Sequence, residues 1–247
     1  MLVREGIDRD DTTDLRLASL LAAVAGALNA AAFYAVGFFS ANMTGNVSTL
    51  SGRLATGQFG SGLFYLAILL AFVAGAASSA WLISAGRRRG IQGIYAFSIF
   101  TEAVLLMGLG GADLWLLDVR RVPVMVLGLA FLMGLQNAVV TRISGARVRT
   151  THISGMATDI GIELATALDI LRGRVPSEEA SQNWTRLRLH LCTVLSFLVG
   201  GVIGVLVYRA VGGWLLIGAS AILLVPAIIG VRRSRSAQMR MITNVVG

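Results

Sequence analysis

The chain contains no lysine, so all 21 residues of its Lys and Arg total are arginine. Charged residues of either sign are also scarce, at 14% of the chain, whereas soluble domains have about 25%. The single cysteine, Cys192, excludes an internal disulfide framework and a cysteine-based zinc site. Because long stretches lack any charge and 55% of the residues are hydrophobic, the composition indicates a membrane protein.

Six apolar stretches have the length of about 20 residues that is needed to cross a bilayer. They lie near 17–38, 62–85, 91–111, 122–141, 187–209 and 212–231. With the N-terminus inside, 17 arginines fall on the inner side and four, Arg53, Arg120, Arg121 and Arg209, on the outer side. The positive-inside rule then predicts that both termini are cytoplasmic in a bacterial inner membrane.

The placement of the charged residues excludes two other classes of protein and describes the two ends of the chain. The arginines cluster at the ends of apolar runs, so the formal net charge of +8 does not indicate nucleic-acid binding. A cleavable signal is excluded because residues 5–14 are acidic where a signal peptide is basic. We expect that acidic stretch to be disordered, within a cytoplasmic arm over 1–16, and residues 232–247 to form a cytoplasmic tail.

Part of the sequence occurs twice. Residues 26–30, Gly-Ala-Leu-Asn-Ala, are similar to residues 134–138, Gly-Leu-Gln-Asn-Ala. Residues 44–46, Thr-Gly-Asn, return as residues 154–156, Ser-Gly-Met. Each half has three spans, and an odd number of crossings turns the second copy upside down relative to the first.

We therefore predict an all-α, polytopic membrane protein. Its six transmembrane helices form two inverted three-helix repeats, 17–111 and 122–231. The polar segments near 42–57 and 152–170 are predicted to be broken or re-entrant, because a full crossing by both would place the arginines of residues 87–89 outside. A repeated polar break of this kind predicts a binding site between the repeats.

Asparagines within two spans are the first candidates for that site. Asn29 and Asn137 occupy equivalent positions, and Gln136 precedes the second. A buried amide in lipid needs a hydrogen-bond partner, so one interpretation is that these side chains hold helices together. The other is that Asn29 and Asn137 face a central site and bind a polar solute or an ion.

The repeated polar motif supplies the second group of candidates, namely Thr44, Gly45, Asn46, Ser154 and Gly155. Glycine permits a close backbone approach, and a preceding hydroxyl can cap a helix. Together they predict a half-helix whose amide end points at an anion. Ordinary helix capping is the alternative.

Charged residues near or within the spans form a third group. Glu102 lies near the middle of a span, where an acid is costly and often marks a pathway, although a neutral structural role is also open. His152, Asp159 and Glu163 share a helical face, which permits a metal cluster, but we expect no resident metal and no cofactor. Instead, Glu163 is expected to pair with Arg53, its equivalent in the first repeat.

The remaining arginines near the spans are assigned to the inner surface. Arg142, Arg147 and Arg149 are expected to anchor lipid headgroups or to line an inner vestibule that attracts anions. An Arg-rich cytoplasmic loop is expected over 172–184.

The sequence resembles a known family. The segment 42–46, Asn-Met-Thr-Gly-Asn, follows a Gly-x-x-Asn-Ala span, and residues 149–155 read Arg-Thr-Thr-His-Ile-Ser-Gly. These motifs, with residues 134–138, are similar to the YoaK-like family of bacterial membrane proteins over roughly 17–231. The resemblance implies a membrane location and a helix-rich fold without a substrate. It also implies an acid where this chain has Asn29, and asparagine cannot exchange a proton.

The leading functional hypothesis is a secondary transporter or channel for a small polar solute, with an anion as one option. Its partners are then the lipid bilayer and that solute; the oligomeric state is open. The alternative is a membrane scaffold or sensor that acts through the Arg-rich loop. An enzyme is not expected, because the sequence has no His-Glu-x-x-His motif and no glycine-rich nucleotide loop.

Overall fold

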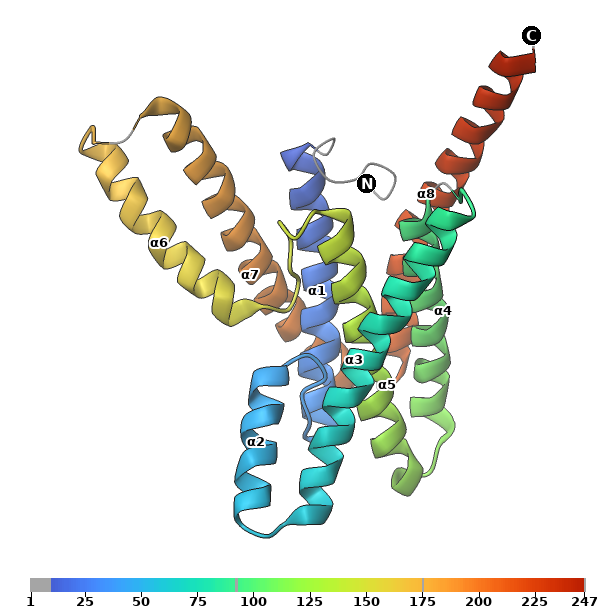
Figure 1. Cartoon of the computed structure of the whole chain (residues 1–247). Coiled ribbons are helices and arrows are strands. Elements are labelled where there is room, and N and C mark those ends of the chain that lie inside the picture. Colours follow the sequence, from blue (N-terminus) through green and yellow to red (C-terminus); the bar gives the residue numbers. More distant parts are fainter. Residues whose placement is uncertain (1–9, 92, 175, 247) are drawn as a thin grey trace.

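A computed structural model of the chain describes residues 10–91, 93–174 and 176–246. Within these ranges it contains eight α-helices and no strand (Figure 1). They are α1 (Asp11–Val36), α2 (Met43–Ala55), α3 (Phe59–Arg88), α4 (Ile94–Trp115), α5 (Asp118–Ile143), α6 (Ile153–Leu171), α7 (Ser177–Val211) and α8 (Trp214–Val246).

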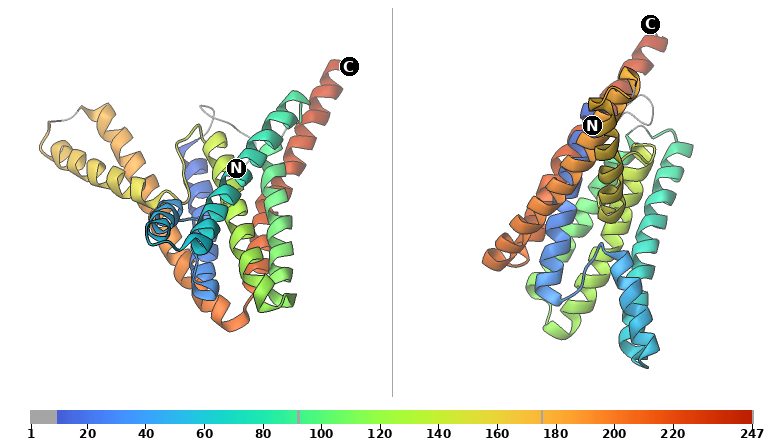
Figure 2. Two further views of the ribbon diagram at one scale, coloured as in Figure 1. Left: turned by 60° about the horizontal axis from the view of Figure 1, so that its bottom comes forward. Right: turned by 90° about the vertical axis from the view of Figure 1, so that its left-hand side faces the viewer.

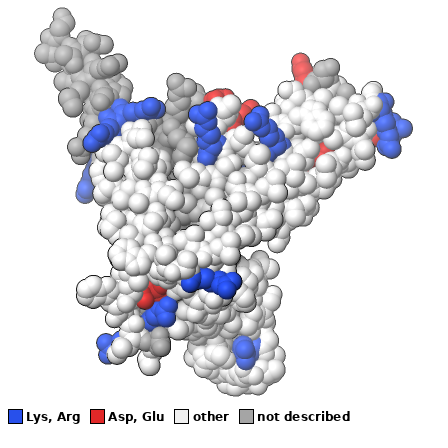
Figure 3. Space-filling model, turned by 180° about the vertical axis from the view of Figure 1, so that it is seen from behind, with Lys and Arg blue, Asp and Glu red and all other residues white. Residues whose placement is uncertain are grey.

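Six of these helices, α1, α3, α4, α5, α7 and α8, are long and apolar enough to cross a membrane. They coincide with the six predicted spans, and they make the chain a multi-pass membrane protein. Charged side chains lie mostly towards two ends of the molecule in Figure 3, with a broad uncharged band between them. Such a band is the surface that a hydrocarbon core of about 30 Å requires.

The helices extend further than predicted at three of their ends. α1 begins at Asp11, so residues 11–14 are helical where the sequence predicted disorder; residues 1–9 lie outside the described part. Asp11 and Asp14 in the first turn stabilise that helix end through its dipole. α7 begins at Ser177, which shortens the predicted Arg-rich loop to a five-residue connection over 172–176. α8 runs on to Val246, so the predicted tail continues a helix.

The long helices pair mainly between the two halves of the chain. α1 packs along α7, α3 along α5, and α4 along α8. In Figure 1, α1 leads away from the end of the bundle where both termini lie, and α5 runs back towards it. We call this end the termini end.

Glycines bring the paired helices into backbone contact at equivalent positions. A Cβ atom at Gly26 of α1 would clash with the carbonyl of Phe197 on α7, and one at Gly134 of α5 would clash with the carbonyl of Phe72 on α3. The glycines are thus required for close packing. These matched contacts agree with an inverted repeat, which stays a prediction.

The two remaining helices follow the connections 37–42 and 144–152, which we call the first and second connectors. α2 packs on α3, and α6 packs on α7. In Figure 1 and the left view of Figure 2, α6 and the first half of α7 project from the bundle. Neither α2 nor α6 is among the six helices suited to span a membrane. Both begin near the middle of the molecule, where the two halves meet (Figure 1).

Candidate solute-binding site

A central cavity of about 540 Å³ lies where the two connectors meet. Four of the predicted binding residues line it: Asn29, Thr44, Asn137 and Ser154. The complete lining is Asn29, Phe39, Ala41, Asn42, Met43, Thr44, Phe72, Asn137, Thr141, Arg149, Thr151, His152, Ile153, Ser154 and Phe197. Both halves of the chain therefore contribute polar residues and a helix start to one cavity.

Asn29 holds the first connector and also presents a donor. Its Oδ1 accepts a hydrogen bond of 2.8 Å from the backbone N–H of Ala41, and the Ser40 hydroxyl lies 3.5 Å from the same oxygen. This bond fixes the orientation of the amide, so the NH₂ group is the other end. Although Asn29 is only 7% exposed and lines the cavity, its NH₂ group has no acceptor among the described residues.

Asn137 makes the corresponding bonds in the second half. Its Oδ1 accepts from the hydroxyl of Thr151 at 3.0 Å, and its NH₂ group donates to the carbonyl of Met133 at 2.7 Å. Each asparagine thus ties its span to the connector that follows. Both asparagines hold helices and connectors together, as one interpretation expected. The amide donor of Asn137 is used within α5, and the binding of a solute by Asn29 stays a prediction.

The starts of α2 and α6 explain the repeated glycines. The side chain of Asn42 accepts a hydrogen bond from the N–H of Gly45 at 3.0 Å and caps α2. His152 is the N-cap of α6 but makes no such bond. A Cβ at Gly45 would clash with Asn42, and one at Gly155 with the ring of His152. The glycines therefore shape the helix starts, and neither lines the central cavity.

Asn46 likewise lies outside the lining of the cavity. It is buried, and its NH₂ group donates to the carbonyl of Phe39 at 3.1 Å. This bond holds the first connector against α2. The function of Asn46 in the structure is therefore the positioning of that connector.

The charge of the central cavity is positive. Arg149 of the second connector lines it and forms no ion pair or hydrogen bond within the described residues. No acidic residue is part of the lining. The positive ends of the α2 and α6 dipoles also face it, because Thr44 and Ser154 in the first turns belong to the lining. Sequence reasoning placed Arg149 among three arginines without distinguishing it from Arg142.

A chain of polar side chains connects this cavity with Glu102. Oε1 of Glu102 accepts a hydrogen bond of 2.8 Å from the NH₂ group of Gln136 on α5. The hydroxyl of Thr150 lies 3.4 Å from Oε1 of Gln136 and 3.4 Å from Oδ1 of Asn137. The sequence identified both end members, but the order of the chain depends on helix packing.

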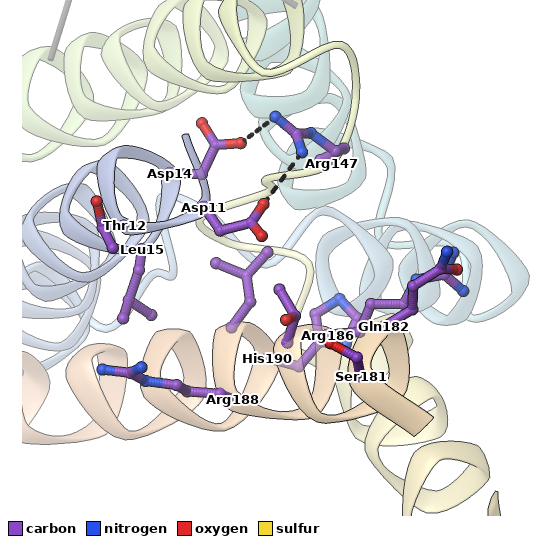
Figure 4. Close-up of a pocket in the computed structure, with 12 residues that line it drawn as sticks. Asp11, Thr12, Asp14, Leu15, Arg147, Ser181, Gln182, Arg186, Arg188 and His190 are labelled. Carbon is purple, nitrogen blue, oxygen red and sulfur yellow. Dashed lines mark hydrogen bonds and ion pairs between the residues drawn. The ribbon is translucent and has the colours of Figure 1, made fainter. Parts of the chain in front are cut away.

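A second, larger cavity of about 610 Å³ lies between the start of α1 and α7 (Figure 4). Arg147 of the second connector bridges Asp14 at 2.6 Å and Asp11 at 3.4 Å beside it. A third cavity, of about 430 Å³, shares Arg147 and His190 with this one and shares Arg149 with the central cavity. We call the second and third cavities together the vestibule. The vestibule lies beside the central cavity, on the side of the termini end.

The predicted pair of Arg53 and Glu163 does not form. Glu163 accepts from Nδ1 of His190 on α7 at 2.9 Å, and Arg53 donates to Gln58 within the first half. The prediction was wrong because Arg53 on α2 and Glu163 on α6 lie on separate helix hairpins. Asp159 is exposed and borders the vestibule; the described residues contain no cluster of three metal-ligating acids, histidines or cysteines.

Sequence reasoning missed a buried cluster at the end opposite the termini. Asp113 of α4 accepts from Nε of Arg121 at 2.7 Å and from the hydroxyl of Tyr208 at 2.8 Å. Arg121 also donates to that hydroxyl at 2.8 Å. The cluster joins α4, α5 and α7. Its sequence signal was Asp113 together with Arg121 in the predicted outer connection between the third and fourth spans.

Comparison with known proteins identifies the chain by family only. No curated protein and no solved structure matches it. The family described as "Protein of unknown function (DUF1275)" matches residues 17–229, which include all six long helices in whole or in part and both connectors. This match confirms the resemblance to the YoaK-like group. The chain belongs to the DUF1275 family.

Proposed function

We propose that the protein is a secondary transporter or channel that binds a small polar anion in the central cavity. It acts in the bacterial cytoplasmic membrane with both termini in the cytoplasm, and it has no enzymatic activity. The observation that carries the proposal is a single cavity to which both halves contribute an asparagine and a helix start. A site between two repeats, bordered by half-helix starts, is the arrangement found in several transporter folds.

The chemistry of the lining supports an anion as the substrate. Arg149 supplies a full positive charge, the starts of α2 and α6 supply partial ones, and the NH₂ group of Asn29 supplies a buried donor. The volume of about 540 Å³ lies within the range of roughly 300–1,000 Å³ that is usual for small-molecule sites. The apolar part of the lining consists of Phe39, Ala41, Met43, Phe72, Ile153 and Phe197.

The vestibule supports a transport role over a static binding role. It lies beside the central cavity on the side of the termini end, which the arginine distribution assigns to the cytoplasm. At the opposite end, the Asp113 cluster joins three helices. Cavities towards one end and a hydrogen-bonded helix cluster at the other agree with one state of alternating access.

The test is the melting temperature of the detergent-purified full-length protein in sodium salts of small anions at constant ionic strength. Formate, acetate, nitrate, sulfate and phosphate are compared with neutral sugars, amino acids and nucleobases. Binding to the folded state at 100 times Kd stabilises it by about 2.7 kcal/mol. We expect at least one anion to raise the melting temperature of the wild type.

Two arginine variants decide whether the stabilisation comes from the central cavity. Arg149→Gln should remove the anion-dependent shift, because it removes the full charge from the lining. Arg142→Gln is the matched control; its side chain donates to Ser84 and lies outside the lining, so the shift should persist. An equal shift in both variants, or stabilisation by neutral solutes alone, would refute the proposed anion site.

The scaffold alternative gains no specific support from the fold. The predicted loop over 172–184 is mostly helix, and Arg172 and Arg174 both lie within 4 Å of Asp169. Deleting this whole segment would remove the start of α7 together with the loop. A docking role is better tested by replacing Arg172 and Arg174 with glutamine, which leaves the helices intact; the transport proposal predicts unchanged anion stabilisation.

A further inference from the structure

Glu102 is a buried acid of α4 and the candidate for a second binding site. It lies in the middle of α4 and is only 1% exposed, with its side chain directed towards α5. Ser220 occupies the corresponding position of the second half and donates to the carbonyl of Ala103 at 2.6 Å. The acid therefore has no acidic equivalent in the other repeat, and its function belongs to one half only.

The hydrogen bonding of the Glu102 carboxyl group fits a protonated acid. Oε1 accepts the hydrogen bond from Gln136, whereas the buried Oε2 has no hydrogen-bond partner among the described residues. Glu102 also forms no ion pair within the described part of the chain. A buried carboxylate without a cation is strongly unfavourable, so a group in this position binds a proton or a cation when it is enclosed.

The surroundings favour a proton over a metal cation. A cation such as Na⁺ or Mg²⁺ needs several oxygen ligands, but the NH₂ group of Gln136 points its hydrogens at the carboxyl group. A proton needs only Oε2. The proton bonds to that oxygen, which neutralises the carboxyl group, while Oε1 keeps the hydrogen bond from Gln136.

The site is connected with the central cavity through exchangeable hydrogen bonds. The Thr150 hydroxyl has one hydrogen and lies equally far from acceptors on Gln136 and Asn137. It can therefore donate to only one of them at a time. A solute that rearranges the bonds of Asn137 or Thr151 changes which bond Thr150 makes, and so changes the support that Gln136 gives to Glu102.

We propose that Glu102 is a proton-binding site that couples proton movement to anion movement through the central cavity. The coupling part rests on the proposed transport function, whereas the proton site stands without it. With a proton on Oε2, a bound anion is accompanied by one compensating charge, so a proton and a monovalent anion cross together without net charge. Release of the proton leaves a carboxylate that retains the hydrogen bond from Gln136.

The proton site is tested by pH-dependent infrared difference spectroscopy of the purified full-length protein, with the proton itself as the probe. The wild type should show the carbonyl band of a protonated carboxyl group at neutral pH, and Glu102→Gln should lose it. Glu163→Gln is the matched control, because Glu163 is also buried but belongs to a different pair; the band should remain. A spectrum unchanged by Glu102→Gln would overturn the proposal.

A second variant keeps the test valid if Glu102→Gln does not fold. Gln136→Leu removes the one hydrogen bond that the described residues donate to Oε1, so the same carbonyl band should move to higher frequency and not disappear. A band at an unchanged frequency in Gln136→Leu would contradict the assignment to Glu102.

Coupling is measured separately in proteoliposomes that contain a pH-sensitive dye. An inward gradient of the anion that stabilises the purified protein should acidify the lumen in the wild type, and Glu102→Gln should abolish the acidification while the anion still raises the melting temperature. Anion binding without any proton movement in the wild type would refute the coupling and leave the proposed anion site standing. A Glu102 carbonyl band without anion binding would refute the transport function and leave the proton site standing.

Discussion

At the residue scale, the central cavity depends on side chains that hold their own connectors. Asn29 bonds to the backbone of Ala41 in the first connector, and Asn137 bonds to the hydroxyl of Thr151 in the second. The difference matters because a backbone N–H that loses its acceptor cannot turn away, whereas a hydroxyl can rotate to another one. The two asparagines are thus equivalent in position but unequal in structural importance.

This difference gives a prediction on stability. Asn29→Ala leaves the N–H of Ala41, which is only 8% exposed, without its acceptor, and should lower the free energy of unfolding by about 1–3 kcal/mol. Asn29→Asp retains an acceptor oxygen and should restore most of the loss. Unfolding titrations with a denaturing detergent measure both. Equal stability of Asn29→Ala and the wild type would show that the connector is held by other contacts.

A pair of hydroxyl variants on α2 tests the extent of the anion site. Thr44 lies in the first turn and lines the central cavity, whereas Ser48, one turn later, does not. Thr44→Ala should reduce the anion-dependent rise in melting temperature, and Ser48→Ala should leave it unchanged. Both side chains are exposed, so neither change should lower the melting temperature without anion. The site assignment fails if Ser48→Ala has the larger effect.

The sequence predicted some of these residues and not others. Asn29, Thr44, Asn137 and Ser154 were found because the repeat marks them twice. The partner of Glu102 was not predicted, because Gln136 reaches it from another helix and the crossing of helices leaves no local pattern. Residues that are joined only by tertiary packing remain hidden from a single sequence.

At the element scale, glycines decide how closely the helices of the two halves approach. The backbone of Gly26 meets Phe197 on α7, and that of Gly134 meets Phe72 on α3. In contrast, Gly108 of α4 and Gly218 of α8 have no atom within 4 Å of an added Cβ. Glycine is therefore required for close packing at Gly26 and Gly134. At Gly108 and Gly218 the contacts reveal no such requirement.

Alanine substitutions should separate these two sets. Gly26→Ala and Gly134→Ala should each destabilise the protein by about 1–3 kcal/mol, because the added methyl group forces the paired helices apart. Gly108→Ala and Gly218→Ala are matched helical controls and should cause no loss of stability. Melting temperatures in one detergent measure all four. A loss in the controls as large as in the paired glycines would remove the packing explanation.

At the scale of the whole molecule, the inverted repeat predicts opposite locations for two similar helix hairpins. The connection between α2 and α3 includes Thr56, and the connection between α6 and α7 includes Arg172, both of which are exposed. In a Cys192→Ser background, Thr56→Cys should react with a membrane-impermeant thiol reagent in intact spheroplasts, and Arg172→Cys only after lysis. Labelling of both before lysis would contradict the inverted arrangement.

Much of the whole-molecule architecture could be predicted because bilayer thickness sets the length of an apolar span, and because charged residues mark where each span ends. Six spans followed from runs of about 20 apolar residues, and the broken segments followed from their polarity. A vestibule was one of the two expectations for Arg147 and Arg149, and both residues line it. The projection of α6 and the vestibule wall that α7 forms could not be predicted, because the sequence does not state how far α7 continues beyond its span. Residues 177–186 are polar enough to resemble a loop and yet form the first turns of α7.

The pairing of helices between halves also has a consequence for biogenesis. α1 packs along α7 and α3 along α5, so neither can complete its packing while the first half alone has left the ribosome. The glycine-bearing face of α3 stays exposed to lipid, or is shielded by an insertion factor, until α5 has been synthesised, and that of α1 until α7 has been synthesised. A polypeptide that stops after α4 therefore retains uncovered intramembrane surfaces, which mark it as a substrate for membrane quality-control proteases.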